Sequence, residues 1–445
     1  MDIKKKEHKT NKSSIDLDNI PQYPGGLEDA VEFPLLEALI GRRSRRFSLG
    51  AEIPDGKFGF SSKHDPLPLS ELEQIMILTS VTGNTGWQYL IPYNKNYLPN
   101  IPNYEMSAGG RICPSSAGFH TSELFYTDDN GVYFLPTRDA PSLTELDSEN
   151  SLDLKDYLDK HRSRIQKIFD KRLHIPRNTD HMEAHNHWCA NTPGSTLIIP
   201  VADLAQQHLG TLCYLVQNEK CIYDDIHNNQ VPGMVRFSNI VDVDNPLPLS
   251  FIEQLSLTGL TVEISTSCYA GMLMLQAIGL GGWMYNGINP FSVLGASGDP
   301  EVTGLGFRYD TDERWPLPNV TGLPGVLEGY CPPHYANMKE AVEAVVKRKF
   351  GPGGPFNEGT PGPYSDNPGV RSGGKVHNDE FKECVTTIAQ YIYDGFGKFP
   401  ATIPSIFIVM YLQAHHLELE YYDNYFRGQA YLDTHANHMK NWHSE

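Results

Sequence analysis

Four arginines, Arg42, Arg43, Arg45 and Arg46, lie within five consecutive positions of the stretch GRRSRRFSLG, residues 41–50. A guanidinium group stays charged and donates paired N–H groups, so several that converge suit a phosphate ester. The competing interpretation is a solvated basic turn that makes surface ion pairs. The chain has 36 basic and 54 acidic residues and a formal charge of −18, so the basic cluster is local. It suits a small anion better than a nucleic acid or an anionic membrane.

A second stretch with chemical potential is AGGRICPSSAGFH, residues 108–120. It contains a turn of small residues: Pro114, Ser115, Ser116, Ala117 and Gly118. Such a turn can lie flat against a planar ring and offer N–H and O–H donors, although an ordinary tight loop has the same composition. His120, directly after the turn, is a candidate proton donor to a substrate, and a structural hydrogen bond is the alternative.

The third stretch, AIGLGGWMYNGINP, places Gly279, Leu280, Gly281 and Gly282 after an apolar run that predicts a buried helix over 267–282. Glycines there leave room for a flat ligand, and a simple helix C-cap is the alternative. The chain has no GxGxxG fingerprint after a strand and no Walker P-loop.

The surrounding sequence predicts the elements that position these stretches. An apolar pattern of helical spacing ends at Gly41, just before the arginines. Ser70 with Glu73, and Ser250 with Glu253, each have the spacing of a capping box at a helix start. The run SELFYTDDNGVYFL, residues 122–135, predicts a hairpin that turns at Asp129–Gly131. The Gly- and Pro-rich segment 350–374 predicts an extended arm, with helices beyond it.

Taken in order, these stretches resemble the FMN-dependent nitroreductases, especially their branch of peptide-azoline dehydrogenases. The residues Arg42-Arg43-Ser44-Arg45-Arg46 match an RRSxRxF-like motif, although Phe47 comes one residue early. The segment from Gly110 to His120 resembles the family's GR-x-x-PSxG-x-xH segment, and MLMLQAIGLGG resembles its helix and GLG turn. Gly329-Tyr330-Cys331-Pro332 matches a later G-Y-x-P segment.

The resemblance implies an α+β fold, with a mixed or antiparallel sheet wrapped by helices, in an intertwined homodimer that binds FMN. Arg42, Arg43, Ser44 and Arg46 would then hold the phosphate, the ribityl chain and the N1/O2 edge. Residues 114–118 would pack on the isoalloxazine from the partner subunit, and residues 279–282 would line its redox edge. Arg371 and Lys375 are candidates for a further phosphate ligand. The implied activity is hydride transfer to or from a small organic or peptide-derived substrate, with NAD(P)H as a candidate reductant.

The sequence also predicts a domain division. We expect a disordered basic tail over 1–26, a main domain over 27–350 with an inserted subdomain at about 141–245, and an arm with a helical extension over 351–445. Seven scattered cysteines favour buried free thiols in a reducing compartment. The basic start lacks an apolar region behind it, so a soluble cytoplasmic protein is the expectation.

Two histidine-rich clusters have ligand-like spacing. One comprises His181, His185, His187 and Cys189; the other comprises His416 and Glu420, with His415, His435, His438 and His443 nearby. Histidines in amphipathic helices are most often polar surface, so neither cluster is predicted to bind a metal. Two alternatives to a flavoenzyme stay open: a metal-dependent enzyme that uses the second cluster, and a flavin-binding protein without turnover.

Overall fold

The computed structural model describes residues 15–16, 23–89, 103–138, 152–428 and 430–443. The predicted tail over 1–26 therefore lies mostly outside the described residues. Its described part is β1 (Ile15–Asp16), which pairs in parallel with β8 (Leu152–Asp153), and the start of α1 (Gly26–Glu32).

The main sheet has seven strands in the order β14-β19-β10-β6-β7-β9, with β18 also paired to β10. Every pair in it is antiparallel. Its strands are β6 (Ser122–Asp128), β7 (Gly131–Leu135), β9 (Gln166–Phe169), β10 (Thr196–Asp203), β14 (Gly281–Tyr285), β18 (Ile406–Phe407) and β19 (Tyr411–His415). The predicted α+β class is confirmed, and so is the hairpin of β6 and β7, in which Asp128 accepts hydrogen bonds from the backbone N–H groups of Asn130 and Gly131.

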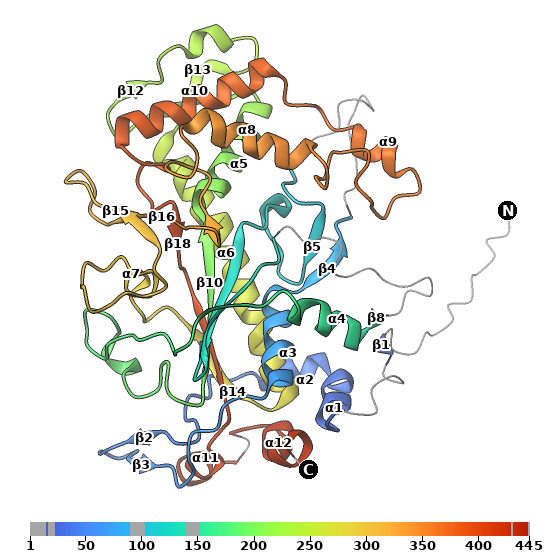
Figure 1. Cartoon of the computed structure of the whole chain (residues 1–445), viewed down its shortest axis with the longest axis vertical. Helices are drawn as coiled ribbons and strands as arrows, with labels where there is room; N and C mark the ends of the chain where they lie inside the picture. Colours follow the sequence, from blue (N-terminus) through green and yellow to red (C-terminus); the bar gives the residue numbers. More distant parts are fainter. Residues whose placement is uncertain (1–14, 17–22, 90–102, 139–151, 429, 444–445) are drawn as a thin grey trace, which may run out of the picture.

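The sheet is covered on both faces, because successive side chains of its strands alternate between two apolar cores. Tyr126 and Ile198 pack into one core with α3 (Glu71–Thr82) and α6 (Leu249–Ile278), whereas Phe125 and Ile199 pack into a second core on the opposite face. Figure 1 shows α6 running beside the sheet. Helices α8 (Met338–Phe350) and α10 (Asp379–Phe396) lie at one end of the molecule, and α11 (Leu419–Tyr425) and α12 (Asp433–Trp442) lie at the other (Figure 1).

Two helices matter most for the site, α3 (Glu71–Thr82) and α6 (Leu249–Ile278). The capping box that Ser70 and Glu73 predict at the start of α3 is confirmed. The second predicted capping box is wrong: the Ser250 hydroxyl donates to Asp225, and the Glu253 carboxylate accepts hydrogen bonds from the backbone N–H groups of Ala401 and Thr402. Contacts with residues distant in the sequence therefore replace the local capping hydrogen bonds of Ser250 and Glu253.

The remaining helices are α2 (Leu35–Gly41), α4 (Leu154–Arg162), α5 (Leu204–Gln217), α7 (Pro290–Leu294), α8 (Met338–Phe350), α9 (Asn367–Ser372), α10 (Asp379–Phe396), α11 (Leu419–Tyr425) and α12 (Asp433–Trp442). Small sheets are formed by β2 (Glu52–Ile53) with β3 (Phe60–Ser61), β4 (Asn84–Trp87) with β5 (Gly109–Arg111), β12 (Asn229–Gln230) with β11 (Lys220–Asp224) and β13 (Asp242–Pro248), and β15 (Arg308–Asp310) with β16 (Asn319–Leu323) and β17 (Leu327–Glu328).

The expected domain division needs correction. The stretch 141–245 contributes β10 between β6 and β19, so this part is integral to the main sheet rather than an inserted subdomain. The C-terminal stretch also supplies β18 and β19, because its apolar run fits a buried strand. The segment 350–374 is not wholly extended, since it contains α9.

All seven cysteines are free and buried, as predicted. Over the part of the chain that is described, no helix combines the length and the apolar character needed to cross a bilayer.

Candidate cofactor site

The arginine motif and the glycine turn, which lie far apart in the sequence, are hydrogen-bonded side by side. The backbone N–H of Arg45 donates to the Gly282 carbonyl at 3.2 Å, and the Gly282 N–H donates to the Arg45 carbonyl at 2.8 Å. The segment after α2 is therefore extended along β14. In an extended segment, adjacent side chains point to opposite sides.

Arg45 points into the protein and is only 2% exposed. Its guanidinium donates to the Gln276 side-chain oxygen at 2.6 Å, to the Ala430 carbonyl at 2.8 Å and to the Gly41 carbonyl at 3.2 Å. Burial lowers the pKa of Arg45 to about 10, which still leaves it charged at neutral pH. These hydrogen bonds connect α2, α6 and the C-terminal segment, so the role of the Arg45 side chain is structural.

Arg46 lies on the other side of the segment, where its guanidinium carbon is 5.4 Å from the centre of the Trp283 ring. Arg42 and Ser44 lie four and two residues before Arg46, so the alternation of side chains in an extended segment would put them on the side of Arg46. Arg43 is exposed and donates to the nearby carbonyls of Ile40 and Arg42. The four arginines thus do not converge on one point, and the set that could grip one anion is Arg42, Ser44 and Arg46.

The surroundings of Arg46 contain polar groups that the described protein does not satisfy. The Trp283 Nε1 atom and the Tyr285 hydroxyl are buried, and neither has a hydrogen-bond partner among the described residues. These two rings stack with their centres 4.7 Å apart. On the other side of the arginine segment, a groove of about 600 Å³ is lined by Ile40, Arg43 and Leu432 among others. The polar atoms beside Arg46 fit a planar polar ligand, whereas the groove lies on the side of Arg43 and Arg45 and is separate from them.

The glycine turn is packed against protein. Gly279 ends α6 in the left-handed conformation, with φ of 79°, and a Cβ atom there would lie 2.2 Å from the Thr434 carbonyl oxygen. A Cβ on Gly282 would lie 2.1 Å from the Gln413 carbonyl oxygen. Leu280 is buried, and a Cβ on Gly281 would press on the His415 ring. Close approach of α12 and β19 therefore accounts for these glycines.

Replacing Gly279 with alanine should displace α12, because the new methyl group would collide with a backbone oxygen rather than a flexible side chain. The left-handed conformation alone costs about 1–2 kcal/mol for a residue with a Cβ atom. The matched control is Gly325→Ala, whose φ of 74° is similar but whose Cβ meets nothing within 4 Å. Limited proteolysis should release the C-terminal segment faster in Gly279→Ala than in the control. Equal rates would mean that α12 does not depend on this contact.

The turn of small residues is held against the middle of α6. Ser115 donates to the buried Glu263 carboxylate at 2.5 Å, and the backbone N–H of Ser122 donates to its other oxygen at 3.0 Å. Gln88 supports the opposite side of the turn through the Gly118 carbonyl. Pro114, Ser116 and Ala117 remain exposed, so the outer face of the turn is accessible.

His120 lies behind the turn rather than on its accessible face. The residue is 4% exposed, and its backbone N–H donates to the Ser115 hydroxyl oxygen. Burial lowers the pKa of His120 to about 4, although the nearby Glu263 carboxylate acts in the opposite sense. The imidazole is therefore neutral at pH 7. It is buried, and its Nδ1 atom has no hydrogen-bond partner among the described residues, so the ring does not reach the accessible face of the turn.

The small-residue turn and the arginine segment are far apart within one chain. The turn contacts α6 at Gly259 and Glu263, while Arg45 contacts it at Gln276. The separations of 17 and 13 residues along the helix correspond to about 25 Å and about 20 Å. One flavin ring cannot touch both within a single subunit.

The candidates for a further phosphate ligand lie elsewhere. Arg371 is 4% exposed and donates to the carbonyls of Pro355 and Pro361, so it organises the Gly- and Pro-rich segment. Lys375 is exposed in the same region.

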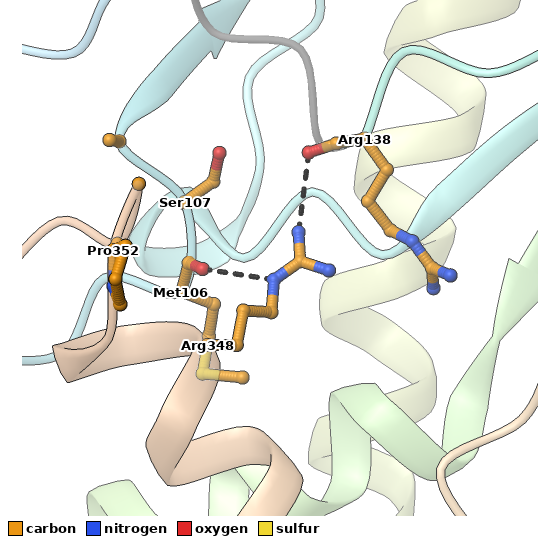
Figure 2. Close-up of a pocket in the computed structure, with 8 residues that line it drawn as sticks. Met106, Ser107, Arg138, Arg348 and Pro352 are labelled. Carbon is orange, nitrogen blue, oxygen red and sulfur yellow. Dashed lines mark hydrogen bonds between the residues drawn. The ribbon is translucent and has the colours of Figure 1, made fainter. Parts of the chain in front are cut away.

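A cavity that the sequence did not indicate lies between β5 and the end of α8. It has a volume of about 250 Å³ and is lined by Met106, Arg138 and Arg348 among others. Figure 2 shows Arg348 donating to the carbonyls of Met106 and Arg138. Arg138 also pairs with Asp203 at 3.3 Å. Both guanidinium groups are engaged by protein atoms, so the cavity is a weaker anion site than its arginines suggest.

The two histidine-rich clusters have different outcomes. In the first, His181 contacts Ser292 and Asp299, and His187 contacts the Met182 carbonyl, so these rings do not converge. In the second, Glu420 turns outward to pair with Lys63. His416, however, meets His438, His443 and Glu73. Glu73 was not among the possible metal ligands that the sequence indicated, because its predicted role in the capping box already accounted for it.

Comparison with known proteins gives little further support. No family model matches the chain, and no curated protein matches it. Among solved structures, the crystal structure of a protein assigned as a nitroreductase from Ralstonia eutropha is similar over 58% of this chain and 72% of that chain. The sequence identity is 13% and the TM-score is 0.28, too low to assign a fold family.

Proposed function

We propose that the protein is an FMN-dependent oxidoreductase that works as a homodimer. The observation that carries the proposal is the hydrogen-bonded pairing of Arg45 with Gly282. The pairing supports the proposal, because an extended segment beside β14 would have Arg42, Ser44 and Arg46 on one side. The flavoenzyme resemblance assigns these three residues to FMN. The unsatisfied polar atoms of Trp283 and Tyr285 next to Arg46 support a bound polar ring.

The homodimer is supported by an exposed apolar stripe along α6. Phe251, Leu255, Val262 and Tyr269, which follow helical spacing, are 51%, 41%, 48% and 37% exposed. On α2, Leu35, Leu36, Leu39 and Ile40 are also exposed. Apolar surface of this extent on neighbouring helices is typical of a protein interface.

A two-fold axis that crosses α6 near residue 268 would bring the distant motifs together across the dimer interface. It would place residues near 259–263 of one subunit opposite residues near 276 of the other. The partner's small-residue turn would then face the arginine segment, and one FMN would bind between them at each end of the interface.

FMN, when bound, would supply hydride exchange through N5. Arg42 and Ser44 would bind its phosphate and ribityl groups, and the charge of Arg46 would favour the reduced ring near N1. Ser116 and the backbone of the partner's turn would orient the ring and exclude water. The substrate would be a small organic or peptide-derived molecule, and NAD(P)H would be the candidate electron donor.

The first test is the visible spectrum of the purified protein together with the double variant Arg42→Ala/Arg46→Ala. The wild type should carry a flavin that denaturation releases as FMN. The double variant should bind FMN at least about 100-fold more weakly, since it loses two charge-assisted contacts. Arg236→Ala/Arg314→Ala, which removes two exposed arginines elsewhere, is the charge-matched control.

A colourless protein that does not take up FMN would refute the proposal. FMN binding without reduction by NADH or NADPH, and without bleaching by any substrate, would favour a flavin-binding protein without turnover.

A further inference from the structure

Glu73, His416, His438 and His443 come from distant parts of the sequence and direct their ligand atoms to one point. Each offers one such atom, and all four lie within 4.8 Å of one another. The Glu73 Oε1 atom is 3.3 Å from His416 Nε2, 2.7 Å from His438 Nε2 and 3.0 Å from His443 Nε2. The His416 and His443 Nε2 atoms are 3.2 Å apart.

The hydrogen bonds behind two of the rings fix which nitrogen faces the centre. His416 Nδ1 lies 2.9 Å from the Leu67 carbonyl oxygen, and His438 Nδ1 lies 2.6 Å from the Ile278 carbonyl oxygen. A carbonyl can only accept, so each Nδ1 carries the proton. In the neutral rings, both Nε2 lone pairs then point at a carboxylate oxygen. Backbone carbonyls behind ligating imidazoles are a common support of metal sites.

The carboxylate is also held from behind. Its Oε2 atom accepts the backbone N–H of Ser70 at 2.6 Å, which leaves Oε1 for the cluster. The carboxylate is fully buried, and the three imidazole Nε2 atoms lie 2.7–3.3 Å from its Oε1 atom. A cation bound between these atoms would accept the nitrogen lone pairs and balance the carboxylate charge.

We propose that these four residues form a divalent transition-metal site, with zinc as the best fit, that fastens the C-terminal helix α12 to α3 and to the end of β19. Three imidazole nitrogens and one carboxylate oxygen suit zinc, and its bond lengths of 2.0–2.1 Å put tetrahedral ligand atoms about 3.3 Å apart. Four protein ligands leave no open position for water or substrate, which is typical of a structural site. The site is independent of FMN binding.

The role of the site follows from its position. His438 and His443 belong to the last helix and its C-cap, while Glu73 and His416 belong to the main domain. Helix α12 also covers the end of α6, where Thr434 donates to the Gln276 carbonyl. Metal binding would hold α12 over the glycine turn and next to Gln276, to which Arg45 donates a hydrogen bond.

Elemental analysis of the full-length protein, produced with zinc in the medium and without a histidine tag, tests the proposal. The wild type should retain about one zinc per chain, and His416→Ala and His443→Ala should each reduce retention to about a tenth or less. His185→Ala, at an exposed histidine, and His435→Ala, at a buried histidine of α12 outside the cluster, should retain zinc. X-ray absorption at the zinc edge should show only nitrogen and oxygen neighbours.

A chelator gives a second readout that does not need activity. It should lower the melting temperature of the wild type and expose α12 to protease, while leaving the His443→Ala variant unchanged. His443 lies at the end of the chain and is partly exposed, so this variant should still fold. The proposal is overturned if the wild type contains no zinc and takes none up in titration, or if the two ligand variants retain as much zinc as the controls.

Discussion

In the proposed FMN-binding homodimer, Val262→Arg should give a monomer that no longer retains FMN. Val262 is 48% exposed in the middle of the apolar stripe on α6. A two-fold axis across α6 would bury both copies of the new arginine against the partner helix. An unpaired charge in the core of an interface costs several kcal/mol, enough to dissociate a typical dimer at micromolar concentration.

Loss of FMN should accompany dissociation, because the small-residue turn of the partner would be removed from the flavin. Light scattering after size-exclusion chromatography and the flavin-to-protein absorbance ratio measure the two effects. Val235→Arg is the matched control, since Val235 is 76% exposed and lies in a short helical turn outside α6. A monomer with undiminished FMN would place the whole site in one chain, and a persistent dimer would place the interface elsewhere.

Arg45→Ala should destabilise the fold far more than loss of its neighbour Arg43. The variant removes a buried guanidinium with three acceptors and leaves the Gln276 side chain and the Ala430 carbonyl without their donor. We expect the free energy of unfolding to fall by about 3–5 kcal/mol. Arg43→Ala, at an exposed side chain, should change it by about 0.5 kcal/mol or less.

Urea denaturation of the FMN-free proteins measures this difference without a contribution from the ligand. Arg45→Ala should then lower the free energy of unfolding, whereas Arg42→Ala/Arg46→Ala should lower the affinity for FMN. If Arg45→Ala instead left stability unchanged and abolished FMN binding, the assignment of the two sides of the arginine segment would be reversed.

Local structure was predictable where local chemistry decides it. The hairpin of β6 and β7 follows from two aromatic, β-prone runs that flank an Asp-Asn-Gly turn, and the start of α3 follows from the Ser70–Glu73 spacing. The same reasoning failed at Ser250, because Asp225 supplies its acceptor from another element. The placement of β10 and β19 in the centre of the sheet also escaped prediction, since strand order depends on pairing between distant segments.

The sequence by itself determined which residue types could bind an anion or a metal, because that depends on side-chain chemistry. It also determined which short stretches form helices and strands, because that depends on periodicity within a few residues. The tertiary structure alone decided which of them act together. Pairing of the arginine segment with β14 separates Arg45 from Arg46, and packing of α12 on α3 adds Glu73 to the histidines. Both results depend on backbone hydrogen bonds and packing between residues hundreds of positions apart, which no local pattern specifies.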